Sequence, residues 1–442
     1  MTNTFIRSTK HTLKFSNKEK KKQLNLFIQE YRRIAELYRD YIWNNHFKFT
    51  YIKDSKLTTL HFNSTTKLNL PTMLSTVKIN KELNINTFLT ARVQKCCLTQ
   101  VLSILRGNVE KQRKRQYIVN QLRSKSKKIP KNLRKKVRIN KPTKPDFSNL
   151  NPELNSICIN LREEQNKEFN SFIQLSSFTT EQRGKTINFP IKYHRNTEKW
   201  RKQGKLLNSF LITPTRVELR YEITKEPKIK KKKKKVGADQ GELTVLTLSD
   251  NQITPEKDNH NHTLTSILDK MSRKKKGSKA FKKCQEHRKN FINWSINQLN
   301  FKDITEIGFE RVKNLKYKNR LPKHLIHWTY TEIRDKLTRR CEEEEVLLTS
   351  QSSIYKSQRC SYCGLVLRSQ RKGKVYTCKN CGLEIDADLN ASLNHQQDLP
   401  DVPYDLRKLN LNRKQGFFWK TTGFYNSLTG EELTVPLPKK LS

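Results

Sequence analysis

An apolar residue stands at every second position from Val217 to Ile223, and Glu or Arg fills the positions between them. Successive side chains of a strand point to opposite faces of a sheet, so this alternation predicts a half-buried strand. Residues 186–193 and 205–212 are two further strand-like runs, which we expect to be its neighbours. With the short, basic, strand-like start of the chain, they favour a small β-barrel interrupted by a helical insertion.

The helical insertion is predicted from a different spacing. Apolar residues recur every three or four positions over residues 24–42, which is the pattern of an amphipathic helix packed on a core. Ser16 and Glu19 precede this helix with the spacing of a capping box. A second amphipathic segment covers residues 87–105, and residues 123–145 form a Lys-, Arg- and Pro-rich linker or helical hairpin.

The charge of the chain narrows the class of partner. The 442 residues carry 90 Lys and Arg against 41 Asp and Glu, a formal net charge of +49. Such self-repulsion destabilises a compact protein unless a polyanion offsets it, and the excess suggests a long, wrapped nucleic acid. An anionic membrane surface is the less favoured partner, because the basic residues are spread over the whole chain and not gathered on one amphipathic helix.

The densest basic run is the six lysines at 230–235. Six like charges in a row do not pack together, so we expect an exposed linker. This linker is either a solvated tether or a phosphate contact, and it is a nuclear import signal only if the host is a eukaryote.

No run of 18 apolar residues occurs, and the N-terminus has no signal-peptide pattern, so we expect no membrane segment. Nine cysteines, five of them scattered, indicate a reducing compartment and not secretion. We therefore expect a cytoplasmic, nucleoid-associated protein in a prokaryote, or a nuclear one in a eukaryote. The scattered cysteines are interpreted as buried thiols: Cys96, Cys97, Cys158, Cys284 and Cys341.

The other four cysteines form two pairs, Cys360-x2-Cys363 and Cys378-x2-Cys381. Two such pairs are typical of a structural zinc site, in which four thiolates close a tetrahedron and leave no position for chemistry. Four reduced thiols without metal are the alternative.

Three acidic residues stand at expected strand ends or helix starts. Asp239 stands between Gly237 and Gly241, just before an apolar run, and Glu310 ends the run Ile304–Phe309. Asp388 follows the second cysteine pair. Each alone is also typical of a turn or a surface, but spaced carboxylates at strand ends are what a fold supplies to hold two divalent cations. Alternation predicts that Glu310 and Gly308 share one face of their strand.

The order of these motifs resembles the RuvC-like nuclease half of the TnpB family, which includes transposon TnpB proteins, miniature type V-F CRISPR effectors and Fanzor relatives. The resemblance covers residues 236–394 and includes Asp388-Leu389-Asn390-Ala391, which matches the family's Asp-x-Asn-Ala motif. It assigns catalysis to Asp388 and leaves Asp386 as a helix cap or a supporting residue. Asn390 and Asn394 are expected to tie this helix to the sheet or to the zinc element. The chain departs from the family at Lys356, where Thr is usual.

The resemblance implies a multidomain α+β fold with a wedge-like N-terminal β-barrel, a helical recognition insertion and a RuvC-like RNase H fold that contains the zinc ribbon. The implied parts are the barrel at 1–20 and 180–228, the insertion at 21–179, the linker at 229–235, the nuclease at 236–355 and 385–400, the ribbon at 356–384 and a tail at 401–442. Aromatic residues of the tail either stack on bases or, as we favour, pack back on the nuclease: Phe417, Phe418, Trp419, Phe424 and Tyr425.

The same resemblance implies an RNA-guided DNA endonuclease with two Mg²⁺ ions held by Asp239, Glu310 and Asp388, and one structural Zn²⁺. Its partners would be a guide RNA and double-stranded target DNA with a short adjacent motif, bound by a monomer or by an asymmetric homodimer on one guide. No general-base histidine is required. The expected nucleic-acid contacts are Arg273, Lys274, Lys275, Lys276, Lys279 and Arg359.

Three rival readings remain open. One is an RNA-guided or transposon-associated DNA-binding protein that does not cleave, and another is a zinc-ribbon protein that binds nucleic acid without a guide. The three acids argue against both, because binding alone has no use for a metal clamp. A guide-free resolvase would not need the large basic N-terminal half.

Overall fold

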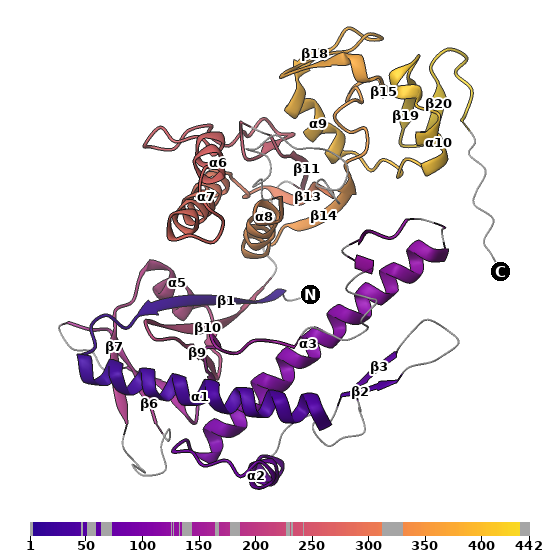
Figure 1. Ribbon diagram of the computed structural model, residues 1–442. Coiled ribbons are helices and arrows are strands. Elements are labelled where there is room, and N and C mark those ends of the chain that lie inside the picture. The colour runs from indigo at the N-terminus through magenta and orange to yellow at the C-terminus, as the bar shows by residue number, and fades with distance from the viewer. Residues whose placement is uncertain are drawn as a thin grey trace. The chain divides into compact units, whose positions relative to one another are not determined.

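The computed structural model describes residues 3–45, 47–50, 59–62, 73–124, 126, 128–131, 133–134, 144–163, 168–176, 186–226, 230, 233–241, 243–311 and 330–433. The chain divides into two compact units (Figure 1). Residues 4–225 form the N-terminal unit, and residues 226–442 with 1–3 form the C-terminal unit. Each unit has its own apolar core, and both mix helices with strands.

Among its described residues, the N-terminal unit combines four helices with two larger sheets and a hairpin. One sheet has the order β1-β10-β9-β4, with β8 also paired to β10, and the other has the order β5-β6-β7. The bounds are β1 Asn3–Thr12, α1 Lys18–Asn45, β2 Phe47–Thr50, β3 Thr59–Phe62, α2 Met73–Glu82, α3 Ala91–Ser124, β4 Glu153–Asn155, β5 Ile159–Arg162, β6 Ser171–Leu175, β7 Ile187–Ile191, α5 Arg195–Gln203, β8 Lys205–Leu206, β9 Ser209–Ile212 and β10 Arg216–Lys225.

Three predictions for this unit need correction. The cap of α1 is Asn17, not Ser16, because Asn17 Oδ1 accepts the backbone N–H of Lys20 at 2.9 Å. The run at 186–193 does form a strand, but β7 pairs with β6 and not with β10. The insertion at 21–179 is not helical throughout, since β4 to β6 lie within it. Most of the basic stretch at 123–145 lies outside the described residues.

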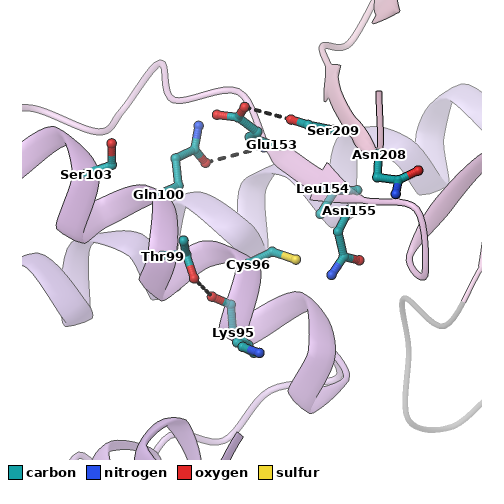
Figure 2. A pocket seen from close by; sticks show the side chains of 10 residues that line it. All are labelled: Lys95, Cys96, Thr99, Gln100, Ser103, Glu153, Leu154, Asn155, Asn208 and Ser209. Atoms are coloured by element: carbon teal, nitrogen blue, oxygen red, sulfur yellow. Dashed lines mark hydrogen bonds between the residues drawn. The ribbon is translucent and has the colours of Figure 1, made fainter. Parts of the chain in front are cut away.

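The strand from 217 to 223 is confirmed. Within β10 the four apolar side chains are buried and the intervening charged ones are partly exposed, and β9 pairs with it in antiparallel register at Val217 and Ile212. A polar pocket lies where α3 approaches β4 and β9 (Figure 2). There Glu153 accepts a hydrogen bond from the Ser209 hydroxyl at 2.9 Å. No cluster of acids or metal-ligand side chains is described in this pocket.

The C-terminal unit is built on a four-stranded sheet with the order β12-β11-β13-β14. Strands β11, β13 and β14 are parallel, and β12 is antiparallel to β11. The bounds are β11 Lys234–Asp239, β12 Thr247–Leu248, α6 Leu264–Ser272, α7 Lys279–Asn297, β13 Ile304–Arg311, α8 Tyr330–Glu344, β14 Leu347–Ser352 and α9 Ala387–Gln396. Apolar side chains of β11 and β13 form one core with those of α6, α7 and α8.

The lysine run is only partly a linker. Strand β11 begins at Lys234, inside the predicted linker. Lys235 is half-buried and forms ion pairs with Glu306 at 3.3 Å and with Asp398. Lys230 donates hydrogen bonds to backbone carbonyls near the start of β13. Lysines that are neighbours in sequence thus contact different carboxylates or backbone carbonyls. The prediction of an exposed linker did not take such partners into account.

The rest of the C-terminal unit consists of short strands around the four paired cysteines. Strands β16 Arg371–Lys372, β17 Val375–Thr377 and β18 Glu384–Asp386 form one antiparallel sheet, and β15 Leu365–Val366 joins β19 Phe417–Lys420 and β20 Gly423–Asn426 in another. Short helical turns η3 Arg368–Gln370, α10 Tyr404–Lys408 and η4 Leu411–Arg413 complete it. Phe417, Trp419 and Phe424 are buried against Val366, so the tail packs back onto this unit as we favoured.

Candidate active site

Two of the three predicted acids lie at the same edge of the sheet. Strands β11 and β13 run parallel, and their register pairs Ala238 with Phe309. The next residue on each strand is Asp239 or Glu310, so both carboxylates leave at the carboxyl ends of neighbouring strands. Their ligand oxygens lie within 4.8 Å of each other and of a ring nitrogen of His395.

The face of the sheet that carries these acids is lined by glycine. A Cβ at Gly237 would lie 1.8 Å from the carbonyl oxygen of Ser392, and a Cβ at Gly308 would lie 2.1 Å from that of His395. Helix α9 therefore packs directly on the strand backbones. Ile307 and Phe309 point to the opposite face and join the core, which confirms the predicted alternation around Glu310.

Asp388 lies in the first turn of α9. Asp386 caps this helix, as expected, because its carboxylate accepts the N–H groups of Asp388 and Leu389, each at 2.9 Å. Asp388 is 3% exposed, and its oxygens accept Arg371 Nη2 at 2.9 Å and Lys374 Nζ at 2.7 Å. Asp388 is close enough to Asp239 to raise the pKa of that carboxyl, but it lies outside the group of ligand atoms formed by Asp239, Glu310 and His395. Two basic side chains at the β16-β17 turn neutralise its charge.

The electrostatics of the site favour a cation. Burial raises the pKa of Asp239, and the nearby charges of Glu310 and Asp388 raise it further. Burial also raises the pKa of Glu310 from its usual 4.5 to about 7. Carboxyl groups that approach each other in a buried site ionise together only when a positive charge joins them. The donor set thus fits a divalent cation such as Mg²⁺, which prefers oxygen ligands.

His395 is a site residue that the sequence analysis missed. It is 1% exposed at the end of α9, and its Nε2 lies 3.9 Å from Asp239 Oδ1. Burial lowers the pKa of its imidazole to about 3, so the ring is neutral. One signal was available in the sequence, because Asp388 and His395 are seven residues apart and so share one face of a helix.

The four paired cysteines come together at one point, with their sulfur atoms within 4.8 Å of one another. Sγ of Cys360 lies 3.6 Å from Sγ of Cys381, and the Cys363 and Cys378 sulfurs are equally close. Four sulfurs bound tetrahedrally at 2.3 Å from one zinc ion are about 3.8 Å apart, so the donor set fits zinc.

Each cysteine pair sits on a turn of the same type. After the first pair, Gly364 has φ +85° and donates its N–H to the Cys360 carbonyl, while the Cys360 N–H bonds Leu365. After the second pair, Gly382 has φ +70° and repeats this arrangement with Cys378. Positive φ favours glycine, which explains its place after each pair.

Helix α9 is tied to the first cysteine turn by two asparagines, as predicted. Asn390 Oδ1 accepts the Ser361 N–H at 2.9 Å, and Asn394 Nδ2 donates to the Arg359 carbonyl at 2.7 Å. Asp388 and the cysteine cluster are consequently parts of one hydrogen-bonded assembly.

Arg359 is not the phosphate contact that we predicted. It is only 4% exposed, and its guanidinium donates to the Trp419 carbonyl at 2.8 Å, to the Cys360 carbonyl at 3.2 Å and to Asn394. The other predicted contacts are exposed around the turn from α6 to α7, where they are available to solvent: Arg273, Lys274, Lys275, Lys276 and Lys279.

Comparisons with known proteins find local similarity to CRISPR-associated nucleases. Residues 330–395 match the family model of the Cas12f1-like TNB domain. A segment of 71 residues is 37% identical to the CRISPR-associated endodeoxyribonuclease Cas12f1 of Sulfoacidibacillus thermotolerans. A segment of 61 residues is 33% identical to the protein of the same name from Syntrophomonas palmitatica. These segments make up 16% and 14% of this chain and 17% and 12% of the two relatives, so less than a fifth of each relative is matched.

The whole chain is similar in fold to the solved structure of the mini-RNA-guided endonuclease CRISPR-Cas_phi3. The TM-score is 0.51 at 9% identity, over 91% of this chain and 94% of that chain. The fold is therefore that of a multidomain α+β protein, as predicted. The resemblance to the TnpB-like family is confirmed at this level. In the part of the chain that the structure describes, no helix is long and apolar enough to cross a bilayer.

Proposed function

We propose that this protein is an RNA-guided DNA endonuclease with a single RuvC-like active site. The observation that carries the proposal is the convergence of Asp239 and Glu310 at one sheet edge, with Asp388 of α9 close enough to raise the pKa of Asp239. The local matches to proteins named as CRISPR-associated endodeoxyribonucleases support it. The net charge of +49 supports a long polyanionic partner, such as a guide RNA with its target duplex.

The three acids would hold the metal ions. Two bound Mg²⁺ ions would supply an activated water for in-line attack on phosphorus and would stabilise the leaving 3′ oxygen. Asp239, the more buried of the two strand-end acids, would hold the ions together with Glu310 and Asp388. For Asp388 to serve, Arg371 and Lys374 must release its oxygens. Those two cations would then be free to contact the DNA phosphates.

The remaining parts have roles that follow from their chemistry. The four cysteines would hold one structural zinc as a ribbon, which fixes the start of α9 and hence Asp388. The exposed basic turn between α6 and α7 would contact the backbone of the guide–target duplex. The N-terminal unit, as a wedge-like barrel with helices, would hold the guide RNA and read a short motif beside the target. The protein would act either as a monomer or as an asymmetric homodimer on one guide RNA.

The decisive experiment expresses the chain with its native flanking DNA, sequences the RNA that co-purifies and tests plasmid cleavage with Mg²⁺. A discrete RNA and cleavage of a matching target, abolished in Asp239→Ala and Asp388→Asn, are expected. Asp386→Ser is the matched control, because Ser also caps a helix and this acid is not assigned to the metal site. A fully active Asp239→Ala protein would overturn the site assignment.

A second function is favoured by one observation. The ion pairs of Asp388 with Arg371 and Lys374 neutralise the third acid, as expected of a guided DNA-binding protein that does not cut. A discrete RNA with target binding, but no cleavage in Mg²⁺ or Mn²⁺, would establish this function.

A further inference from the structure

The imidazole of His395 has no hydrogen-bond partner among the described residues. Its Nδ1 is buried and unpaired, and its Nε2 lies 3.9 Å from Asp239 Oδ1, which is beyond hydrogen-bond range. A buried polar nitrogen without a partner destabilises a fold by about 1–3 kcal/mol. Native proteins rarely carry such a group without a role in binding an ion, a water or a substrate.

The position of the ring points to an ion. Two ligand atoms about 2.1 Å from one divalent cation are roughly 3 Å apart when adjacent and roughly 4.2 Å apart when opposite. The separation of 3.9 Å between Nε2 and Asp239 Oδ1 falls between these values. Glu310 completes the group, since one of its carboxylate oxygens, one of Asp239 and a ring nitrogen of His395 all lie within 4.8 Å of one another.

The backbone holds the ring in this place. The carbonyl oxygen of His395 packs against Gly308, and the next residue of α9 packs against Gly237. The two strands that carry Asp239 and Glu310 are therefore the strands on which the end of α9 rests. Because helical side chains lean toward the N-terminus of their helix, the ring points back toward the site.

We infer that His395 is a nitrogen ligand of the divalent cation held by Asp239 and Glu310, and that it makes this position bind Mn²⁺ or Co²⁺ more tightly than Mg²⁺. The inference rests on the proposed function, because it assumes that these carboxylates hold a metal. Its chemical basis is ligand preference: Mg²⁺ selects oxygen, whereas an imidazole nitrogen favours transition metals. Loss of the ring should weaken Mn²⁺ binding by about 10- to 100-fold and Mg²⁺ binding less.

The test uses Mn²⁺ and the full-length chain with zinc already loaded on its cysteines. Free Mn²⁺ is titrated by electron paramagnetic resonance, and pulsed measurements detect a magnetic coupling between bound Mn²⁺ and nitrogen. Labelling the protein with ¹⁵N-histidine shows whether that nitrogen belongs to a histidine. This measurement uses the wild-type sequence, so it remains possible if His395 variants do not fold. His395→Gln then identifies the residue.

A matched control is available in the same unit. Asp258, His262 and His287 form another group with ligand atoms within 4.8 Å of one another, and none of them belongs to the candidate active site. A histidine coupling that disappears in His395→Gln but persists in His287→Gln is the expected result. The opposite pattern, or Mn²⁺ bound at Asp239 without nitrogen coupling, would overturn the role of His395 and leave the proposed function intact. Equal Mn²⁺ binding by the wild type and Asp239→Ala would show that Asp239 holds no metal. That result would overturn both this inference and the proposed function.

Discussion

The backbone at Gly237 meets the backbone at Ser392: a Cβ on residue 237 would lie 1.8 Å from the Ser392 carbonyl oxygen. Both groups are backbone, so no rotamer change relieves the clash. The contact brings α9, with Asp388 and His395, onto the strand that ends in Asp239. The close approach is therefore what assembles the candidate site from segments about 150 residues apart in sequence.

Gly237→Ala should therefore displace α9 and destabilise the C-terminal unit by more than about 3 kcal/mol. Thermal and denaturant unfolding measure the loss. Gly107→Ala is the control, because nothing lies within 4 Å of a Cβ there and the residue is inside α3. That change should stabilise the protein by about 0.5–1 kcal/mol. Equal stability of Gly237→Ala and the wild type would show that α9 does not rest on β11.

Removal of the zinc should also disturb the candidate active site. Cys378→Ser should reduce the zinc content from about one ion per chain to near zero, because three thiolates close the tetrahedron poorly. The first cysteine turn would then no longer hold Asn390, and Asp388 would lose its position. Metal analysis and cleavage assays measure the two effects. Cys96→Ser, in the N-terminal unit, is the control and should retain both the zinc and the cleavage activity. A zinc-free Cys378→Ser protein with full activity would contradict the link between the zinc and Asp388.

Much of the candidate site follows from the sequence because its residues are set by local rules. Gly364 and Gly382 mark turns with positive φ, and the spacing of four cysteines predicts their meeting point. The alternation around Glu310 predicts its face of the strand. Asp386 is one residue before the helix, at the cap position.

What the sequence did not predict depends on contacts between distant segments. Arg359 resembles any exposed basic residue, but its burial depends on the Trp419 carbonyl 60 residues away. The spacing of His395 from Asp388 indicates a shared helix face, but not that this face meets Asp239, which follows only from the packing of α9 on Gly237 and Gly308. The pairing of β7 with β6 was missed because alternation predicts a strand but not its partner.

Arg371 and Lys374 should compete with metal for Asp388. Both donate to its carboxylate, so a cation at that position must displace them. Replacing both with Gln should lower the apparent Mg²⁺ dissociation constant by a factor on the order of three to ten, since the two pairs are partly exposed and screened. Calorimetric titration measures it. Substitution of exposed Arg368 and Lys372 by Gln is the charge-matched control, and equal affinities in the two double variants would exclude the competition.

Helix α8 ends without glycine at a position that favours it. Glu345 has φ +56°, and the next N–H, of Val346, bonds the Cys341 carbonyl at 2.9 Å, which is a Schellman motif. Glu345→Gly should relieve the left-handed strain and stabilise the unit by about 1 kcal/mol, a rise of roughly 2–4 °C in Tm. Calorimetry measures it. Glu345→Ala removes the same side chain without relieving the strain, so a gain in both variants would assign the effect to the side chain.

The raised pKa of Glu310 predicts a distinctive pH dependence for the protein without added Mg²⁺. Its folded pKa is about 7 and its unfolded pKa about 4.5, so between these values the folded state keeps a proton that the unfolded state has released. Stability from this group is therefore lost as pH rises through that window, by at most about 3 kcal/mol at pH 8. Metal binding needs the ionised carboxylate, so Mg²⁺ affinity should rise over the same window. Melting curves of the wild type and Glu310→Gln from pH 4 to 8, with zinc retained, isolate the contribution. Parallel curves for the two proteins would show that Glu310 ionises normally and is not buried beside Asp239.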